Sequence, residues 1–201
     1  TPLYSSAASD VYKRQGIIML YIVEMAFSDP SKEDEWNDWY NGQKSSELLA
    51  FPGFNATQRF KTDADVPAPY LAIHSITSTD LYTSEVYRKG GGGSAAHWND
   101  LQPNWTRRIF SDIDEMPGVD MAQVLVMVDL APDGVPDLGL DILWAEGLDW
   151  ETASSYRDAI ALDSSVPHRG FAIVAPVTAD ALPKIPGVNV YRPLFKKQTA
   201  S

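Results

Sequence analysis

Apolar and polar positions follow two different periods along the first half of the chain. Residues 17–27 form a nearly continuous apolar, β-branched run, which is typical of a buried central strand. Asp29 and Pro30 then supply an N-cap and a first helical residue, and aromatic side chains recur at helical spacing until Pro52 and Gly53 end the helix. Further strands are expected at residues 54–62, 70–77 and 105–110, and a second helix at residues 78–89. This β-α-β-β-α-β order predicts a ferredoxin-like unit, which leaves one apolar sheet face for another sheet to cover.

The remaining residues are expected to supply that second sheet. Strands are expected at residues 122–130, 141–148, 171–177 and 188–195, and a helix at residues 152–162. Residues 185–189 (IPGVN) echo residues 51–55 (FPGFN), which is a sign of duplication. We therefore predict an α+β protein with a half-barrel domain at residues 19–116 and a degenerate second half-barrel at residues 117–201. A small appended domain is the alternative.

The first residues of the chain do not follow either period. Residues 5–15 resemble the in-frame translation of a transposase-type sequencing-library adaptor, which would make the sequence a metagenomic reading. We expect residues 1–18 to be a non-native or disordered leader and Met19 to be the natural start. A disordered natural N-terminus is the alternative.

Composition and charge narrow the class of protein. The 201 residues carry a net charge of −11, and an acidic surface repels the phosphate backbone of nucleic acids. No apolar run approaches the ~20 residues that span a membrane. The chain has no cysteine, and His74, His97 and His168 lack the spacing of metal ligands. We expect a cytoplasmic protein that binds a small organic substrate without metal or cofactor, with a homodimer and a monomer as the alternative assemblies.

Several short motifs carry a resemblance to a known family. They are Trp39-Tyr40, Glu47-Leu48-Leu49, Pro52-Gly53-Phe54, Gln58-Arg59-Phe60 and Tyr70-Leu71-Ala72-Ile73. Over residues 19–110 this pattern resembles the dimeric α+β barrel superfamily, and within it the EthD-like proteins. The resemblance implies the barrel fold and a range of activities: cofactor-free monooxygenases, muconolactone-type isomerases, lyases or cyclases, and haem enzymes. Lys44 stands where that pattern has a histidine, so a mechanism based on that histidine does not carry over.

His74 and Glu24 are the leading catalytic candidates. Alternation along residues 70–76 places Tyr70, Ala72 and His74 on one face of a strand. We expect the first and third strands to be parallel neighbours, with Glu24 and His74 facing the barrel lumen. A carboxylate that orients an imidazole is an acid–base arrangement. The alternatives are a core histidine bonded to a carbonyl, and two side chains on opposite faces.

Other candidates lie on the first helix and on later strands. Tyr40, Lys44 and Glu47 share one helical stripe, from which Tyr40 would donate to an oxyanion and Lys44 would hold an acidic group. Lys44 and Glu47 are alternatively a solvated surface pair. Arg59 is expected to bind a substrate carboxylate, although strand arginines such as this one, Arg107 and Arg108 also lie at solvent-facing rims.

Aromatic and glycine-rich segments complete the candidate site. Trp36 and Trp105 are expected to contact substrate through an aromatic wall. The glycines at 90–93 are expected to form either a mobile cover for the cavity or a plain linker. Together these features predict a cofactor-independent lyase, dehydratase, isomerase or cyclase. The alternatives are a cofactor-free monooxygenase and a non-catalytic binding or stress-response barrel.

Overall fold

A computed structural model describes most of the chain. The described residues are 18–78, 81, 84, 85, 87, 97–113, 115–148 and 163–201. The expected leader, most of the helix expected at 78–89, the glycine run at 90–93 and the helix expected at 152–162 lie outside them.

The first half of the chain folds into four strands and one long helical segment. The strands are β1 (Ile18–Met25), β2 (Phe54–Lys61), β3 (Tyr70–Ile76) and β4 (Thr106–Ile113). The helical segment between β1 and β2 comprises η1 (Pro30–Lys32), α2 (Glu33–Trp39), the π-helical turn η2 (Tyr40–Lys44) and α3 (Ser45–Leu49). A further short turn, η4 (Asn99–Leu101), precedes β4. The predicted N-cap is confirmed, because the Asp29 carboxylate accepts from the Ser31 N–H at 3.0 Å.

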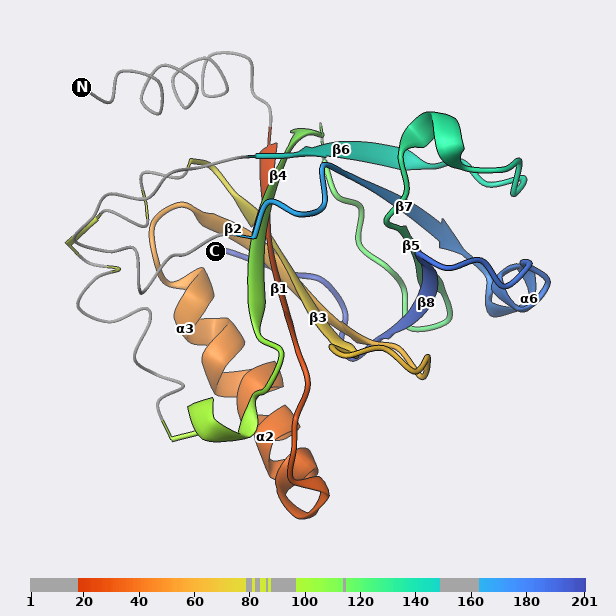
Figure 1. The fold of residues 1–201 in the computed structure, drawn as a ribbon. Coiled ribbons are helices and arrows are strands. Elements are labelled where there is room, and N and C mark those ends of the chain that lie inside the picture. Colours follow the sequence, from red (N-terminus) through yellow and green to blue (C-terminus); the bar gives the residue numbers. More distant parts are fainter. Residues whose placement is uncertain are drawn as a thin grey trace.

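The four strands pair in the order β2-β3-β1-β4, and every pairing is antiparallel (Figure 1). This order is the one that a βαββαβ unit requires, although its second helix lies outside the described residues. The prediction that the first and third strands are parallel was wrong. The helical crossover makes β2 run in the direction of β1, and the β2–β3 hairpin then reverses β3 relative to both.

The second half of the chain supplies the strands that cover the other sheet face. They are β5 (Val124–Val128), β6 (Leu143–Gly147), β7 (His168–Val174) and β8 (Val188–Pro193), paired in the order β6-β7-β5-β8. Each half thus orders its strands second, third, first, fourth. A short turn, η5 (Pro132–Gly134), lies between β5 and β6. The strand expected at 171–177 ends at Val174, because Pro176 begins the short helix α6 (Pro176–Asp180).

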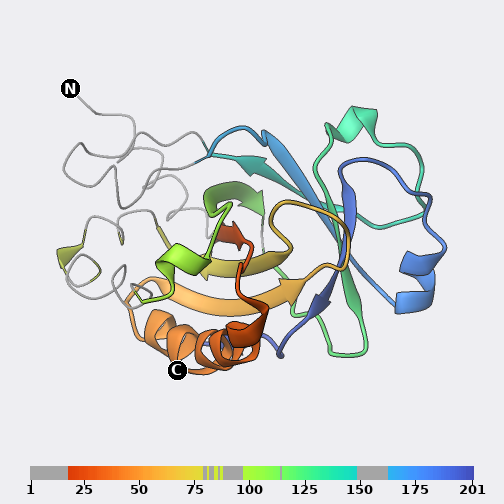
Figure 2. The ribbon, with the colours of Figure 1, turned by 60° about the horizontal axis from the view of Figure 1, so that its bottom comes forward.

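Two short seams close the strands into an eight-stranded antiparallel barrel. At one seam β4 pairs with β6 through Phe110↔Gly147 and Ser111↔Glu146. At the other, β2 pairs with β8 through Phe60↔Pro193 and Lys61↔Arg192, and the two-residue β9 (Gln198–Thr199) adds to β2. Figure 2 shows the second group of strands standing beside the first, away from α2 and α3.

The five-residue echo in the sequence reflects turn geometry. Gly53 and Gly187 both adopt positive φ, +100° and +88°, directly before a strand. These strands are β2 and β8, which are the second strand of one half and the fourth of the other. The echo therefore does not mark equivalent positions of a duplicated unit. The repeated strand order is the feature that relates the two halves, and the domain boundaries stay a prediction.

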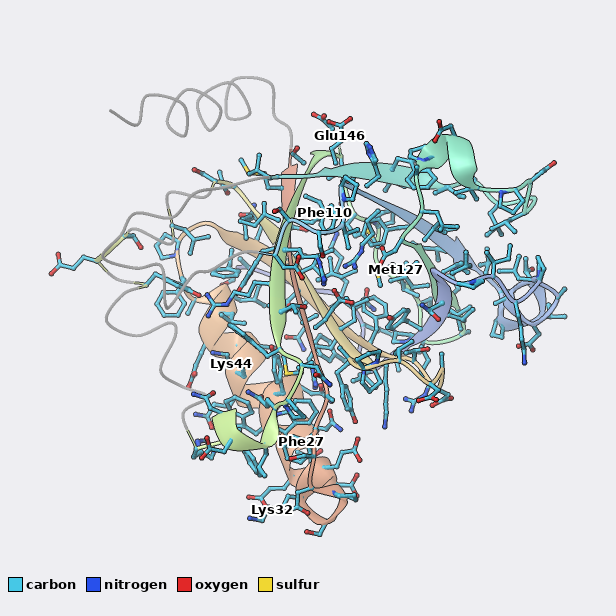
Figure 3. The ribbon with its side chains drawn as sticks, in the orientation of Figure 1. Phe27, Lys32, Lys44, Phe110, Met127 and Glu146 are labelled. Atoms are coloured by element: carbon cyan, nitrogen blue, oxygen red, sulfur yellow. The ribbon has the colours of Figure 1, made fainter. Side chains whose placement is uncertain are left out.

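The β1–β4 sheet separates two cores. One core, here called the helical layer, lies between this sheet and the helical segment and includes Tyr21, Trp36, Tyr40 and Phe54. The other core fills the lumen between the two groups of strands and includes Phe110 from the first group and Met127 from the second (Figure 3). In the described parts of the chain, no helix is long and apolar enough to cross a membrane.

Candidate active site

Glu24 and His74 lie on opposite faces of the β1–β4 sheet. In the β1–β3 register, His74 is paired with Tyr21 and Glu24 with Leu71. Tyr21 belongs to the helical layer, whereas Leu71 belongs to the lumen. Because side chains alternate along a strand, the three-residue step from Tyr21 to Glu24 reverses the face. The prediction that Glu24 orients His74 in a shared hollow was therefore wrong, and each residue must be considered in its own surroundings.

Glu24 belongs to a buried ion network in the lumen. Its carboxylate accepts from Arg108 on β4 and, at 3.1 Å, from Arg169 on β7. Arg108 also contacts Asp163 at 2.8 Å, and Arg169 contacts Asp129 at 2.7 Å. Burial opposes the charge of Arg169, but the two adjoining carboxylates raise its pKa overall. Glu24 thus joins the two halves of the barrel, and its carboxylate is already engaged by cations.

The lumen near β2 and β3 is packed with side chains. A void of about 10 Å³ lies there, beside Phe60, Ile73, Ser75 and Met116. A void of this size holds about one water molecule. The adjoining Gln58 donates to the carbonyl oxygens of Val119 and Phe195, each at 2.8 Å. This end of the lumen therefore offers no room for an organic substrate.

His74 lies in the helical layer among aromatic rings. Its side chain is 1% exposed, and its ring centroid lies 5.5 Å from that of Tyr21 and 5.7 Å from that of Phe54. Burial, aided by the positive charges of Lys44 and Arg59, lowers the pKa of His74 to about 3. The Nδ1 atom is buried and has no hydrogen-bond partner among the described residues. The imidazole is therefore neutral at pH 7 and retains an unused nitrogen.

Arg59 lies in the same layer, two residue pairs further along β2 and β3. Its Nη1 donates to the side-chain oxygens of Asn37, at 3.1 Å, and Asn41. Its guanidinium carbon lies 4.0 Å from the ring centroid of Tyr40, a cation–π contact. Burial lowers the pKa of Arg59 to about 10, so the group stays charged at neutral pH. Its Nη2 is buried and finds no hydrogen-bond partner in the described parts of the chain.

The π-helical turn brings Tyr40 and Lys44 to the inner face of the helix. Four residues of an α-helix overshoot a full turn by about 40°, so a stripe with this spacing drifts around the helix. The wider turn at Tyr40–Lys44 compensates, and Trp36, Tyr40, Lys44 and Leu48 are all buried. Lys44, 8% exposed, is therefore not a solvated surface residue. Burial lowers its pKa, and the charge of Glu47, which also accepts from Gln43 at 2.9 Å, opposes that lowering. Figure 3 shows Lys44 on this helical segment.

The two candidate tryptophans occupy different environments. Trp36 is fully buried, stacks on Phe27 at 4.5 Å and donates from Nε1 to Gln102 at 2.9 Å, which makes it a core residue beneath Arg59. Trp105, 42% exposed, directly precedes β4, and its ring centroid lies 4.1 Å from the guanidinium carbon of Arg107. Trp105 is therefore the tryptophan of the pair that solvent, and a ligand, can reach.

Several residues of the helical layer were not predicted from the sequence. Tyr21 and Tyr87 are buried and share a side-chain hydrogen bond. Asn37 and Asn41 hold Arg59 from the helix. The i, i+4 spacing of the two asparagines was the one feature of the sequence that could have indicated that they act together. Nothing in the sequence linked Tyr87 to Tyr21. In the described ranges, no group of three or more His, Asp or Glu side chains converges in a way that could hold a metal ion.

Comparison with known proteins gives similarity in fold alone. No family model and no curated protein matches the chain. Among solved structures, an anthrone oxidase-like protein matches with a TM-score of 0.50 and 10% identity, covering 94% of this chain and 95% of that one. A candidate monooxygenase from Lactobacillus acidophilus NCFM matches with a TM-score of 0.51 and 8% identity, covering 92% and 100%. Another, from Fusobacterium nucleatum subsp. nucleatum, matches with a TM-score of 0.51 and 7% identity, covering 90% and 94%.

The three matches show the barrel fold alone, and the resemblance to the dimeric α+β barrel superfamily stays a prediction from the sequence. None of these matches points to EthD-like proteins within it, and none bears on the adaptor-like leader.

Proposed function

We propose that the protein is a cofactor-free monooxygenase that acts on a small aromatic molecule with an acidic C–H bond. The observation that carries this proposal is that the unpartnered, buried nitrogens of the helical layer include Nδ1 of His74 and Nη2 of Arg59, a proton acceptor and a cationic donor on one face of the sheet. Unsatisfied buried polar groups are costly, and a catalytic role is one of the reasons for which a fold retains them. The names of the three similar structures favour oxygenase chemistry over the lyase or isomerase that the sequence first suggested.

The two nitrogens suit the first half of such a reaction. Neutral His74 takes a proton from the substrate carbon through Nδ1, and the resulting negative charge spreads onto the substrate carbonyl oxygen. Arg59 donates from Nη2 to that oxygen and stabilises the enolate. A pKa of about 3 makes His74 a weak base in the empty site, but an enolate beside the imidazolium raises that pKa. The base therefore gains strength only when the anion forms.

The second half of the reaction consumes dioxygen. The carbanion gives its electron pair to O2, a C–O bond forms, and the peroxide anion takes the proton back from His74. Loss of water from the hydroperoxide leaves a ketone, so a CH2 group and O2 become C=O and H2O. The substrate supplies all the electrons in this balance. Tyr21 and Phe54, packed on His74, exclude water from the reacting carbon.

Anthrone is a suitable probe because its CH2 group is activated by two rings and a ketone. With the full chain, we expect O2 uptake equal to the anthraquinone formed, above the rate of spontaneous oxidation. His74→Gln should lower the catalysed rate about 100-fold, the usual contribution of a general base. His168→Gln is the matched control, because that half-buried histidine lies on β7 in the other half of the barrel.

Three outcomes would count against the proposal. They are an unchanged rate in His74→Gln, no uptake of O2 above the spontaneous rate, and conversion of substrate under argon. The last would favour a lyase or isomerase, which needs the same proton acceptor but no oxygen.

A further inference from the structure

The arginines on the two faces of the β1–β4 sheet are neutralised differently. In the lumen, Arg108 and Arg169 each contact two carboxylates. In the helical layer, Arg59 and Arg107 have no carboxylate partner among the described residues. An unpaired charge away from water is unfavourable, so binding of an anion would offset a cost that these two arginines otherwise carry.

Arg107 lies where the helical layer meets solvent. It shares a β4 face with Ile109 of that layer, and its side chain is half-buried. Its Nε and Nη1 are buried and have no hydrogen-bond partner in the part of the chain that the structure describes. Trp105 stacks on the guanidinium and keeps an exposed ring surface. Arg107 therefore combines unused donors with an aromatic surface that a ligand can reach.

The charge of Arg107 reaches the proposed reaction site. Burial raises the pKa of Tyr40, and the guanidinium groups of both Arg59 and Arg107 oppose that rise. The same arginine opposes the rise in the pKa of Tyr21, the ring packed on His74.

The strand register places Arg107, Arg59 and His74 on one face of the sheet. Arg107 is paired with Val23, and Val23 with Ala72. Ala72 is in turn paired with Arg59 and lies two residues from His74, on the same side of β3. Arg107 and Arg59 thus lie in one row across the sheet, with His74 in the next row of that face, and a single small molecule bound there would contact all three.

We propose that Arg107 binds the carboxylate of a small aromatic acid, whose ring packs on Trp105. This inference rests on the proposed function for what happens at the inner end: the acid group fixes the outer end of the substrate, and the acidic C–H bond then points toward His74. A guanidinium and a carboxylate form a charge-assisted pair that is strong at a partly buried site. The neutral members of the same aromatic class lack that contact.

Binding of 2-naphthoate and of its neutral analogue 2-naphthamide tests the inference with the full chain. The two probes have nearly the same shape and differ in charge. At pH 7.5, isothermal titration calorimetry should give at least about tenfold tighter binding for naphthoate, the effect of one charge-assisted hydrogen bond. Arg107→Gln should remove that difference by weakening naphthoate alone. Arg192→Gln is the matched control, because Arg192 is exposed and lies 3.7 Å from Asp63 on another part of the barrel.

Equal affinity for the two probes, no binding of naphthoate, or an unchanged naphthoate affinity in Arg107→Gln would each overturn the inference. Oxygen uptake with anthrone, which carries no carboxylate, is independent of these results. Oxidation of anthrone without selective naphthoate binding would reject the acid site and keep the oxygenase. Selective naphthoate binding without oxidation would reject the oxygenase and keep the acid site.

Discussion

Tyr21 and His74 are directly paired across β1 and β3, with their ring centroids 5.5 Å apart and their planes inclined by 31°. The pair places an imidazole in aromatic surroundings, away from the one carboxylate that the sequence suggested for it. Glu24 is separated from it by the thickness of the sheet. The ionisation of His74 is therefore governed by burial and by cations of the helical layer.

The first prediction concerns stability in acid. The pKa of His74 is about 3 in the folded protein and ordinarily 6.5, so below pH 6.5 the unfolded chain binds a proton that the folded chain does not. Stability should fall as the pH is lowered from 6.5 toward 3. Between pH 7.5 and 5.0 this residue should account for about 2 kcal/mol of the loss. Urea unfolding at both pH values should show that the free energy of unfolding falls by about 2 kcal/mol less in His74→Gln than in the parent protein.

His168→Gln provides the control for that measurement. Its half-buried side chain lies on β7, outside the helical layer, so the variant should lose as much stability in acid as the parent. Equal losses for His74→Gln and the parent would contradict the burial of a neutral imidazole at position 74.

The second prediction concerns the ion network in the lumen. Glu24→Gln removes a carboxylate that both Arg108 and Arg169 contact, and leaves their charges partly uncompensated. The free energy of unfolding should fall by about 3 kcal/mol, as when one partner of a buried pair is lost. Asp63→Asn breaks an exposed pair with Arg192 and should cost less than about 0.5 kcal/mol. Similar small losses for both variants would show that the network does not hold the two halves together.

The third prediction concerns close packing at the β4–β6 seam. A Cβ atom at Gly147 would lie 2.5 Å from the backbone oxygen of Val166, which cannot move away without breaking local structure. Gly147→Ala should therefore destabilise the protein by about 1–3 kcal/mol. Gly42→Ala, where a Cβ would meet nothing within 4 Å, should be neutral or stabilising by up to about 1 kcal/mol. Thermal unfolding of the two variants in parallel provides the comparison, and equal effects would contradict the seam geometry.

The fourth prediction concerns Gln58, which fastens two later segments to the barrel. Its Oε1 accepts from the Val119 N–H at 3.0 Å, and its Nε2 donates to carbonyl oxygens of Val119 and Phe195. Gln58→Leu leaves these backbone groups unpaired and should cost about 2–4 kcal/mol in urea unfolding. Gln123→Leu removes an exposed contact with the Asp120 N–H and should cost less than about 0.5 kcal/mol. A mild effect at Gln58 would show that water replaces its contacts.

The positions of most strands could be predicted from the sequence, because a run of apolar residues indicates a buried strand directly. The predicted run at 70–77 became β3, and the run at 122–130 contains β5. The sequence did not predict which face of the sheet each side chain of those strands occupies. Assigning Glu24 and His74 to one face required the direction and register of β1 against β3, and these are set by the crossover and the hairpin.

The candidate site was predictable in its residue types but not in its grouping. His74, Arg59, Tyr40 and Lys44 were identified singly, and the structure places all four in the helical layer. Burial of Lys44 depends on a π-helical turn, which leaves no periodic signal in a sequence. The unpartnered donors of Arg59 and Arg107 were not predictable either, because they depend on the tertiary structure: among the described residues, no acceptor lies within hydrogen-bond distance of them.

The widened turn at Tyr40–Lys44 amounts to one surplus residue within an otherwise regular helix. Such a bulge can arise by insertion of a single codon, and its removal would rephase everything that follows. Ser45, directly after the bulge, is itself fully buried and donates from Oγ to the Tyr40 carbonyl oxygen at 2.7 Å, so Lys44 and Ser45 both face inward. A one-residue change in chain length at this point would therefore alter how the Lys44 side chain lies relative to Tyr40 and the rest of the helical layer.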